Sequence, residues 1–160
     1  MAAPYFPVPF SLLEAQIEVQ QIGESPLTIG SVSVSAFPLR HPQNAWGYRL
    51  ESGGVSIVHA SDFEHGDPGF DRLLRESVRN ADLLIFDSQF TPEEYEQYRG
   101  WGHSTWLEAA RVARDANVKR LVLFHHHPDH DDEALVRIVE HARAEFPNTQ
   151  AAVEGLYLRF

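Results

Sequence analysis

The sequence predicts an α/β fold in which a mixed β-sheet carries helices on its outside. Two patterns support this fold class. The first half of the chain reads as a run of strands, and the second half alternates helices with short apolar strands. The segment Leu121–Phe124 is wholly apolar, which is typical of a strand buried on both faces. A length of 160 residues suits one domain, which we expect to span residues 1–160.

The first half should supply most of the strands. Residues 1–10 hold three prolines and read as an extended arm, because proline suits neither a helix interior nor a central strand. Segments that alternate apolar and polar side chains indicate half-buried strands, and two of them flank Ser52-Gly53-Gly54 as a hairpin would. The expected strands cover residues 17–22, 31–37, 46–50 and 55–60.

The second half should alternate between helix and strand. Thr105 and Glu108 have the spacing of a capping box, so a helix should begin there and extend to about residue 116. Leu135 and the apolar residues after it recur at helical spacing behind the polar block at 125–132. We expect helices at about 70–78, 91–98, 105–116 and 135–146, and strands at 81–86, 121–124 and about 153–158.

Side chains that can bind a metal follow the ends of these strands. The block from residue 125 to residue 132 alone contains four histidines and three aspartates. Strand ends at one edge of a sheet lie together, and open α/β sheets build their sites there. Imidazole and carboxylate groups are ligands of zinc, iron and manganese. The sequence therefore predicts a metal site formed by His41, Asp62 and His125, with His127 or His130 close by.

Each of these residues also has an ordinary structural explanation. His41 could be a loop residue beside Pro42, and Asp62 could be a turn or capping aspartate. His103 could simply precede a capped helix, and the His/Asp block could be a solvated turn that favours a helix N-terminus. Repetition at equivalent strand ends favours the metal site over these readings.

Composition narrows the function. The formal net charge of -10 argues against broad nucleic-acid binding through a basic face, whereas a small anionic substrate stays compatible because bound metal ions dominate their local field. The absence of cysteine excludes disulfides and thiolate ligands and is compatible with a reducing cytoplasm. No apolar run approaches membrane-spanning length and no signal pattern opens the chain. We expect a cytoplasmic protein without a membrane partner.

Five segments, in order along the chain, resemble the metallo-β-lactamase superfamily, and in particular its phosphodiesterase branch that includes ribonuclease Z. They are PLRHPQNAWGYRLE, SIVHASDFEH, ADLLIFDSQFTPEEY, GWGHSTW and VKRLVLFHHHPDHDD. The resemblance implies the layered fold of that family. It further implies a metal-dependent hydrolase that uses a metal-activated water on a small phosphate ester.

The resemblance also implies roles for four residues. His41 would bind one divalent ion, His125 would bind a second, and Asp62 would bridge the two. His103 would be the catalytic histidine that contacts phosphate or assists proton transfer. The implied cofactor is zinc, or manganese or iron, with up to two ions. Occupancy could be partial where ligands of the family pattern are missing.

The chain departs from the family in one respect. The H-x-H-x-D-H motif of the family's first half does not precede PYFPVPF, so the resemblance is to the C-terminal portion only. His125, His127, Asp129 and His130 spell the same pattern, which makes the last three additional candidate ligands. We expect a homo-oligomer, or a complementing N-terminal half as partner. The alternative is a non-catalytic half-domain that binds metal weakly or serves protein association, and metal content separates the two.

Overall fold

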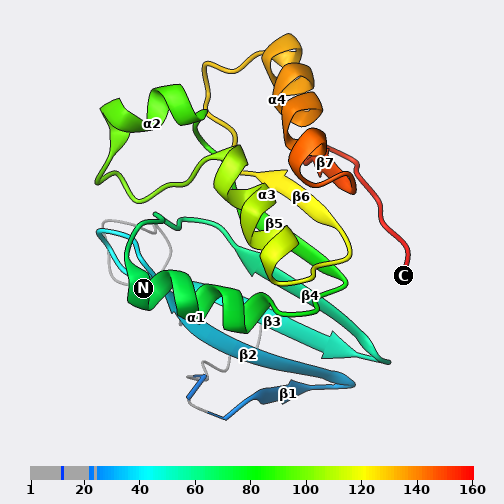
Figure 1. Cartoon of the computed structure of the whole chain (residues 1–160). Coiled ribbons are helices and arrows are strands. Elements are labelled where there is room, and N and C mark those ends of the chain that lie inside the picture. Colours follow the sequence, from blue (N-terminus) through cyan, green and yellow to red (C-terminus); the bar gives the residue numbers. More distant parts are fainter. Residues whose placement is uncertain (1–11, 13–21, 24) are drawn as a thin grey trace.

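A computed structural model describes residue 12, residues 22–23 and residues 25–160 of the chain (Figure 1). In this part of the chain, one seven-stranded mixed sheet has the spatial order β1-β2-β3-β4-β5-β6-β7. The strands are β1 (Leu27–Ile29), β2 (Val32–Leu39), β3 (Ala45–Ser52), β4 (Val55–Ala60), β5 (Leu83–Asp87), β6 (Leu121–Phe124) and β7 (Thr149–Ala151). The helices are α1 (Pro68–Val78), α2 (Pro92–Tyr98), α3 (Trp106–Asp115) and α4 (Asp132–Glu145). The predicted α/β class is confirmed.

Strand direction places the candidate residues at one edge of the sheet. Strands β1 to β4 pair antiparallel, whereas β4, β5, β6 and β7 pair parallel. Strand β2 therefore runs in the same direction as β4, β5 and β6. The carboxyl ends of these four strands meet at the same edge, and the loops that begin with Arg40, Ser61, Ser88 and His125 all start there.

The main core lies between the sheet and three helices. Figure 1 shows α1, α3 and α4 on the same side of the sheet. The strands turn alternate side chains toward these helices, among them Phe37, Val58, Phe86 and Leu123, and these pack with buried helix residues such as Val112. No helix in the described part of the chain is long and apolar enough to cross a membrane.

In the described part of the chain, the opposite face of the sheet carries no helix, and it holds an apolar groove. Ile57, Ile85 and Val122 line its floor, and Leu156 and Phe160 from the C-terminal segment line its wall. Three aromatic side chains remain substantially exposed on strands or at their ends: Trp46 (52%), Tyr48 (37%) and Phe124 (38%).

Two sequence predictions need comment. The arm at residues 1–10 and nearly all of the strand expected at 17–22 lie outside the described residues. The strand expected at about 153–158 is wrong, because the last strand, β7, is at Thr149–Ala151. The chain leaves the sheet after Ala152, whose N–H donates to the Leu123 carbonyl, and Gly155 turns it at a φ of +77°. The apolar alternation in this segment reflects side chains that line the groove.

Candidate functional site

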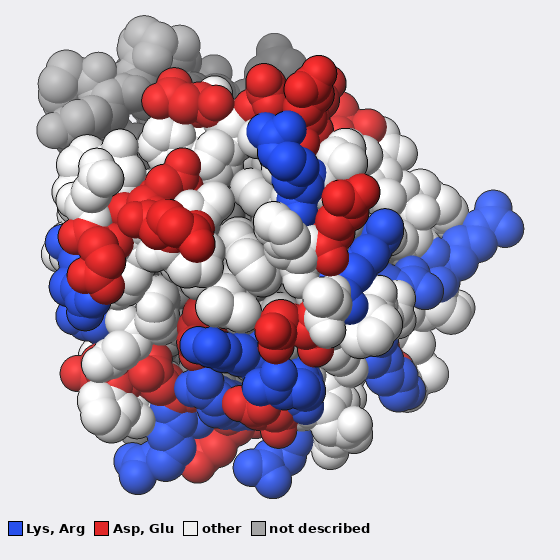
Figure 2. Space-filling view, turned by 45° about the horizontal axis from the view of Figure 1, so that its top comes forward, with Lys and Arg blue, Asp and Glu red and all other residues white. Residues whose placement is uncertain are grey.

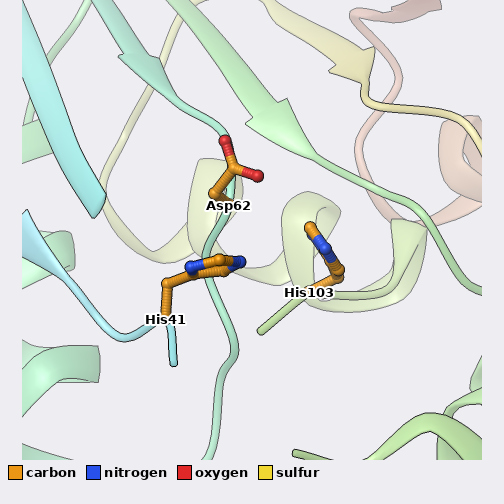
Figure 3. A group of neighbouring side chains, drawn as sticks. All are labelled: His41, Asp62 and His103. Carbon is orange, nitrogen blue, oxygen red and sulfur yellow. The ribbon is translucent and has the colours of Figure 1, made fainter. Parts of the chain in front are cut away.

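Three side chains from distant parts of the sequence converge at the edge formed by the strand ends. His41 follows β2, Asp62 follows β4, and His103 lies in the loop between α2 and α3. A ring nitrogen of each histidine and one carboxylate oxygen of Asp62 all lie within 4.8 Å of one another. Figure 3 shows the three side chains arranged around a common space. Two imidazoles and a carboxylate form a donor set that suits zinc and other divalent ions.

The backbone at two of the strand ends adopts a conformation that is uncommon for residues with a side chain. Asp62 has a φ of 59° and His125 has a φ of 60°. Both values fall in the left-handed region, where the β-carbon is crowded, and such residues concentrate at functional sites. At Asp62 the strained turn is held by its own N–H, which donates to the Asp87 carboxylate over 2.9 Å.

Asp87, at the end of β5, links the separate loops of the site. Its fully buried carboxylate accepts hydrogen bonds from the N–H groups of Asp62 (2.9 Å), Phe63 (3.3 Å) and Ser104 (3.1 Å). It also lies 2.8 Å from Nδ1 of His103. A buried carboxylate must be satisfied by donors, so these four contacts fix the loops that carry Asp62 and His103 relative to each other.

The contact with Asp87 sets the protonation pattern of His103. A carboxylate can only accept, so Nδ1 carries the proton and the lone pair of the neutral ring lies on Nε2. Burial alone would lower the pKa of His103, but the hydrogen bond to Asp87 and the charges of Asp87 and Asp62 raise it above its ordinary value. His103 can therefore hold a proton at Nε2 more readily than a free histidine can.

His125 lies beside His103, one of the three residues of the convergent group His41, Asp62 and His103. Its ring stacks on His103, with a centroid distance of 4.6 Å and an angle of 23° between the planes. The group whose ligand atoms lie within 4.8 Å contains His103 in addition to His41 and Asp62, and does not contain His125. The assignment of His125 as the ligand of a second ion stays a prediction.

His127 and His130 of the block belong to a neighbouring cluster against α2. His130 Nε2 lies 2.9 Å from the Glu94 carboxylate, and the ring of His127 packs near the rings of Phe90 and Tyr98 at centroid distances of 5.7 and 5.8 Å. Asp129 is 90% exposed. These contacts give the three additional candidate ligands a different environment from that of His41 and Asp62.

Two features that support the site carry no motif in the sequence. The buried carboxylate of Glu64 accepts from the N–H groups of Gly100 and Gly102, which are more than thirty residues away. A β-carbon at Gly102 would overlap the His41 ring and lie 2.7 Å from Cδ of Pro42. The available signal in the sequence was Gly102, directly before His103. The His41 ring, which leaves no room for a side chain at Gly102, comes close only in the folded chain.

Comparisons with known proteins agree with this fold. Residues 3–126 match the family described as the beta-lactamase superfamily domain. Over 89 residues the chain is 38% identical to a protein named ribonuclease Z from Geobacillus kaustophilus, and the match covers 56% of this chain and 29% of that protein. The chain thus spans less than a third of the length of the curated relatives it matches.

Two solved structures share the architecture. The metallo-beta-lactamase fold protein YhfI from Bacillus subtilis aligns with a TM-score of 0.68 and 24% identity, over 87% of this chain and 54% of that chain. Zn²⁺-bound PqqB from Methylobacterium extorquens aligns with a TM-score of 0.61 and 16% identity, over 86% of this chain and 54% of that chain. At these identities the likeness concerns the fold.

Proposed function

Because the chain belongs to the β-lactamase superfamily domain family and has the metallo-β-lactamase fold, we propose that it provides part of the site of a metal-dependent phosphodiesterase. The observation that carries the proposal is the convergence of His41, Asp62 and His103 at the strand ends. The three come from separate loops, so their meeting requires the whole sheet from β2 to β5.

The donor set fits a divalent ion. His41 and Asp62 are the proposed ligands, and His125, stacked on His103, is the proposed ligand of a second ion. Zinc is the first candidate, since imidazole nitrogen and carboxylate oxygen are its ordinary protein ligands besides thiolate. A divalent ion bound here would supply Lewis-acid activation of a water and charge neutralisation on a phosphate.

His103 is the proposed catalytic residue. Its Nδ1–H donates to the Asp87 carboxylate, which holds the ring in place and leaves Nε2 as the ring nitrogen that can act on a substrate. The raised pKa of His103 increases the fraction that carries a proton at Nε2 near neutral pH. A protonated Nε2 can hydrogen-bond a phosphate oxygen and donate its proton to the leaving oxygen as a phosphodiester bond breaks.

We propose a small phosphodiester as the substrate. In Figure 2 the Lys and Arg side chains lie mostly in the lower and right parts of the face shown, with Asp and Glu side chains between them, and the chain as a whole has a net charge of -10. Such a surface gives little general attraction for a polyanion. The curated relatives are named ribonuclease Z, so an RNA oligonucleotide is the appropriate second test substrate.

The test measures metal and turnover in the same samples. The purified chain of residues 1–160 is loaded with Zn²⁺, dialysed, analysed for zinc, and assayed with bis(4-nitrophenyl) phosphate. Retained zinc with hydrolysis supports the proposal. Absence of both supports the alternative, a half-domain that serves association with another protein.

Two variants assign the roles. Asp62→Ala removes the only anionic member of the convergent group and should abolish zinc retention, whereas Asp115→Ala on the exposed side of α3 should not. His103→Ala should lower turnover by about 100-fold or more while zinc is retained, with His141→Ala as its control. Loss of zinc in His103→Ala would instead make His103 a ligand.

A further inference from the structure

Glu64 is a buried carboxylate that faces a loop. It lies two residues after Asp62, and only 3% of it is exposed. Its two oxygens accept from two different backbone groups: Oε1 from the N–H of Gly100 and Oε2 from the N–H of Gly102, each over 2.8 Å. The Tyr95 hydroxyl lies 3.3 Å from Oε1 and 3.3 Å from the His65 carbonyl, so its one proton is shared between these two acceptors.

These donors are what keeps the buried charge satisfied. Within residues 25–160, no Lys, Arg or His forms an ion pair with Glu64. A buried carboxylate without a cation depends on hydrogen-bond donors to offset its lost hydration. Burial, together with the charge of Glu64, raises the pKa of Tyr95 to about 12, so the Tyr95 hydroxyl stays protonated and remains a donor. The carboxylate and the 100–104 loop therefore stabilise each other's position.

This contact and the contact of Asp87 act on opposite sides of His103. Asp87 accepts from the His103 ring and from the N–H of Ser104, on the C-terminal side. Glu64 accepts from Gly100 and Gly102, on the N-terminal side. The loop between these points passes close to His41, whose ring centroid lies 5.5 Å from that of His103.

We propose that Glu64 is a positioning residue that holds the 100–104 loop so that His103 lies against His41 and Asp62. The catalytic consequence rests on the proposed function, whereas the geometric part does not. Glu64 forms no hydrogen bond or ion pair with His41, Asp62 or His103. It acts through the backbone that carries His103.

The test uses Glu64→Gln in the full chain. The amide keeps the shape of the side chain but replaces one acceptor oxygen with an NH₂ group, which would then face a backbone N–H. Glu133→Gln is the matched control, because the Glu133 side chain is 87% exposed on α4. Thermal unfolding establishes that each variant is folded at the temperature of the measurements.

The first readout is NMR of the metal-free protein and needs no activity. In the wild type, the amides of Gly100 and Gly102 should exchange slowly, and ring protons of His41 and His103 should show a nuclear Overhauser effect. In Glu64→Gln the exchange rates of the two amides should rise by about tenfold or more, because each loses a hydrogen bond to a charged group. The Overhauser effect between His41 and His103 should weaken. Unchanged exchange and an unchanged Overhauser effect would overturn the proposal.

The second readout is turnover of bis(4-nitrophenyl) phosphate, normalised to bound zinc. Displacement of His103 should lower kcat by about tenfold or more with zinc content unchanged and KM little changed. A role in stability alone would lower the folded, zinc-bound fraction and leave normalised kcat unchanged, which would overturn the catalytic part.

The two readouts separate the two proposals. If the wild type does not hydrolyse the substrate, the proposed function fails, and exchange and Overhauser data still decide the role of Glu64. If Glu64→Gln does not fold, the wild type decides: exchange of Gly100 and Gly102 at the rate of solvent-exposed loop amides would refute the contact with Glu64.

Discussion

Gly102 brings the two sides of the site into contact. Its φ is +97°, and a β-carbon there would overlap the His41 ring and crowd Pro42. Gly100 has a similar φ of +92° but open space where a β-carbon would point. Both positions therefore need a residue that tolerates a positive φ, but only position 102 also lacks room for a β-carbon.

We predict that Gly102→Ala is more damaging than Gly100→Ala. Both substitutions should lose about 1–3 kcal/mol through a left-handed φ, but only Gly102→Ala should push His103 away from His41. Urea unfolding measures the shared loss of stability, and zinc retention and turnover measure the additional effect. Equal behaviour of the two variants would mean that the approach to His41 does not matter.

The pH dependence of stability should reveal the pairing of His103 with Asp87. The pKa of His103 is raised in the folded chain, so protonation favours folding. This contribution is fully present below the unfolded pKa of about 6.5 and is lost as pH rises through the higher folded value. Metal-free wild type should therefore exceed His103→Gln in urea stability by more at pH 5.5 than at pH 8.5. A difference that grows toward alkaline pH would contradict the contact.

The sequence reveals the candidate ligands of the site better than it reveals the buried carboxylates that hold the loops of the site in place. His41 and Asp62 could be predicted because each follows a strand, and strand ends share an edge. The supporting roles of Glu64 and Asp87 depend on N–H groups from loops many residues away. Every residue except proline has a backbone N–H, so the residue type does not reveal which N–H groups will bind these carboxylates.

Among the elements, α2 and α3 show how one sequence pattern produces two structures. Thr91 and Glu94 form a reciprocal capping box at the start of α2. At α3 the Thr105 side chain accepts from the Glu108 N–H, but the Glu108 carboxylate pairs with Arg75 of α1 over 2.7 Å. The predicted box is therefore half formed, because a neighbouring helix offers the carboxylate a cationic partner.

We predict a measurable coupling between α1 and α3 through this pair. A double-mutant cycle of Arg75→Ala and Glu108→Ala should give an interaction free energy of unfolding of about 0.5–1 kcal/mol, since Glu108 is largely buried and Arg75 is partly exposed. The Arg99–Glu96 pair on exposed α2 is the control and should show less coupling. Additive effects for the first pair would show that the contact contributes nothing.

Over the whole molecule, the sequence predicted the mixed sheet with outer helices because hairpin and helical patterns are local. It misplaced the last strand because apolar alternation in residues 153–158 serves the groove of Ile57 and Val122 instead of a ladder. Strand β7 pairs with β6, which lies far away in the sequence. Alternation of apolar and polar residues in a segment does not reveal whether that segment pairs with a strand.

The sheet face on which the described residues place no helix is a candidate surface for self-association. It holds an apolar groove, and exposed Trp46 and Tyr48 alternate on the adjoining β3. We predict a concentration-dependent oligomer in sedimentation velocity, and Trp46→Glu should shift it toward monomer. Lys119→Glu, at an exposed ion pair with Asp82, serves as a surface control. A compact monomer at every concentration, with no binding of an apolar dye, would refute this prediction.

The hydrogen bonds of Asp87 and Glu64 also have a consequence for the order of folding. Strands β1 to β4 form a continuous antiparallel meander whose contacts are local in sequence, whereas β5 and β6 join through longer connections. Local contacts form faster than distant ones. His41 lies in the β2–β3 loop of the meander and Asp62 directly follows β4, but His103 cannot dock until Asp87 has joined the sheet. During refolding, His41 and Asp62 should therefore reach their positions first, and the 100–104 loop with His103 should dock later.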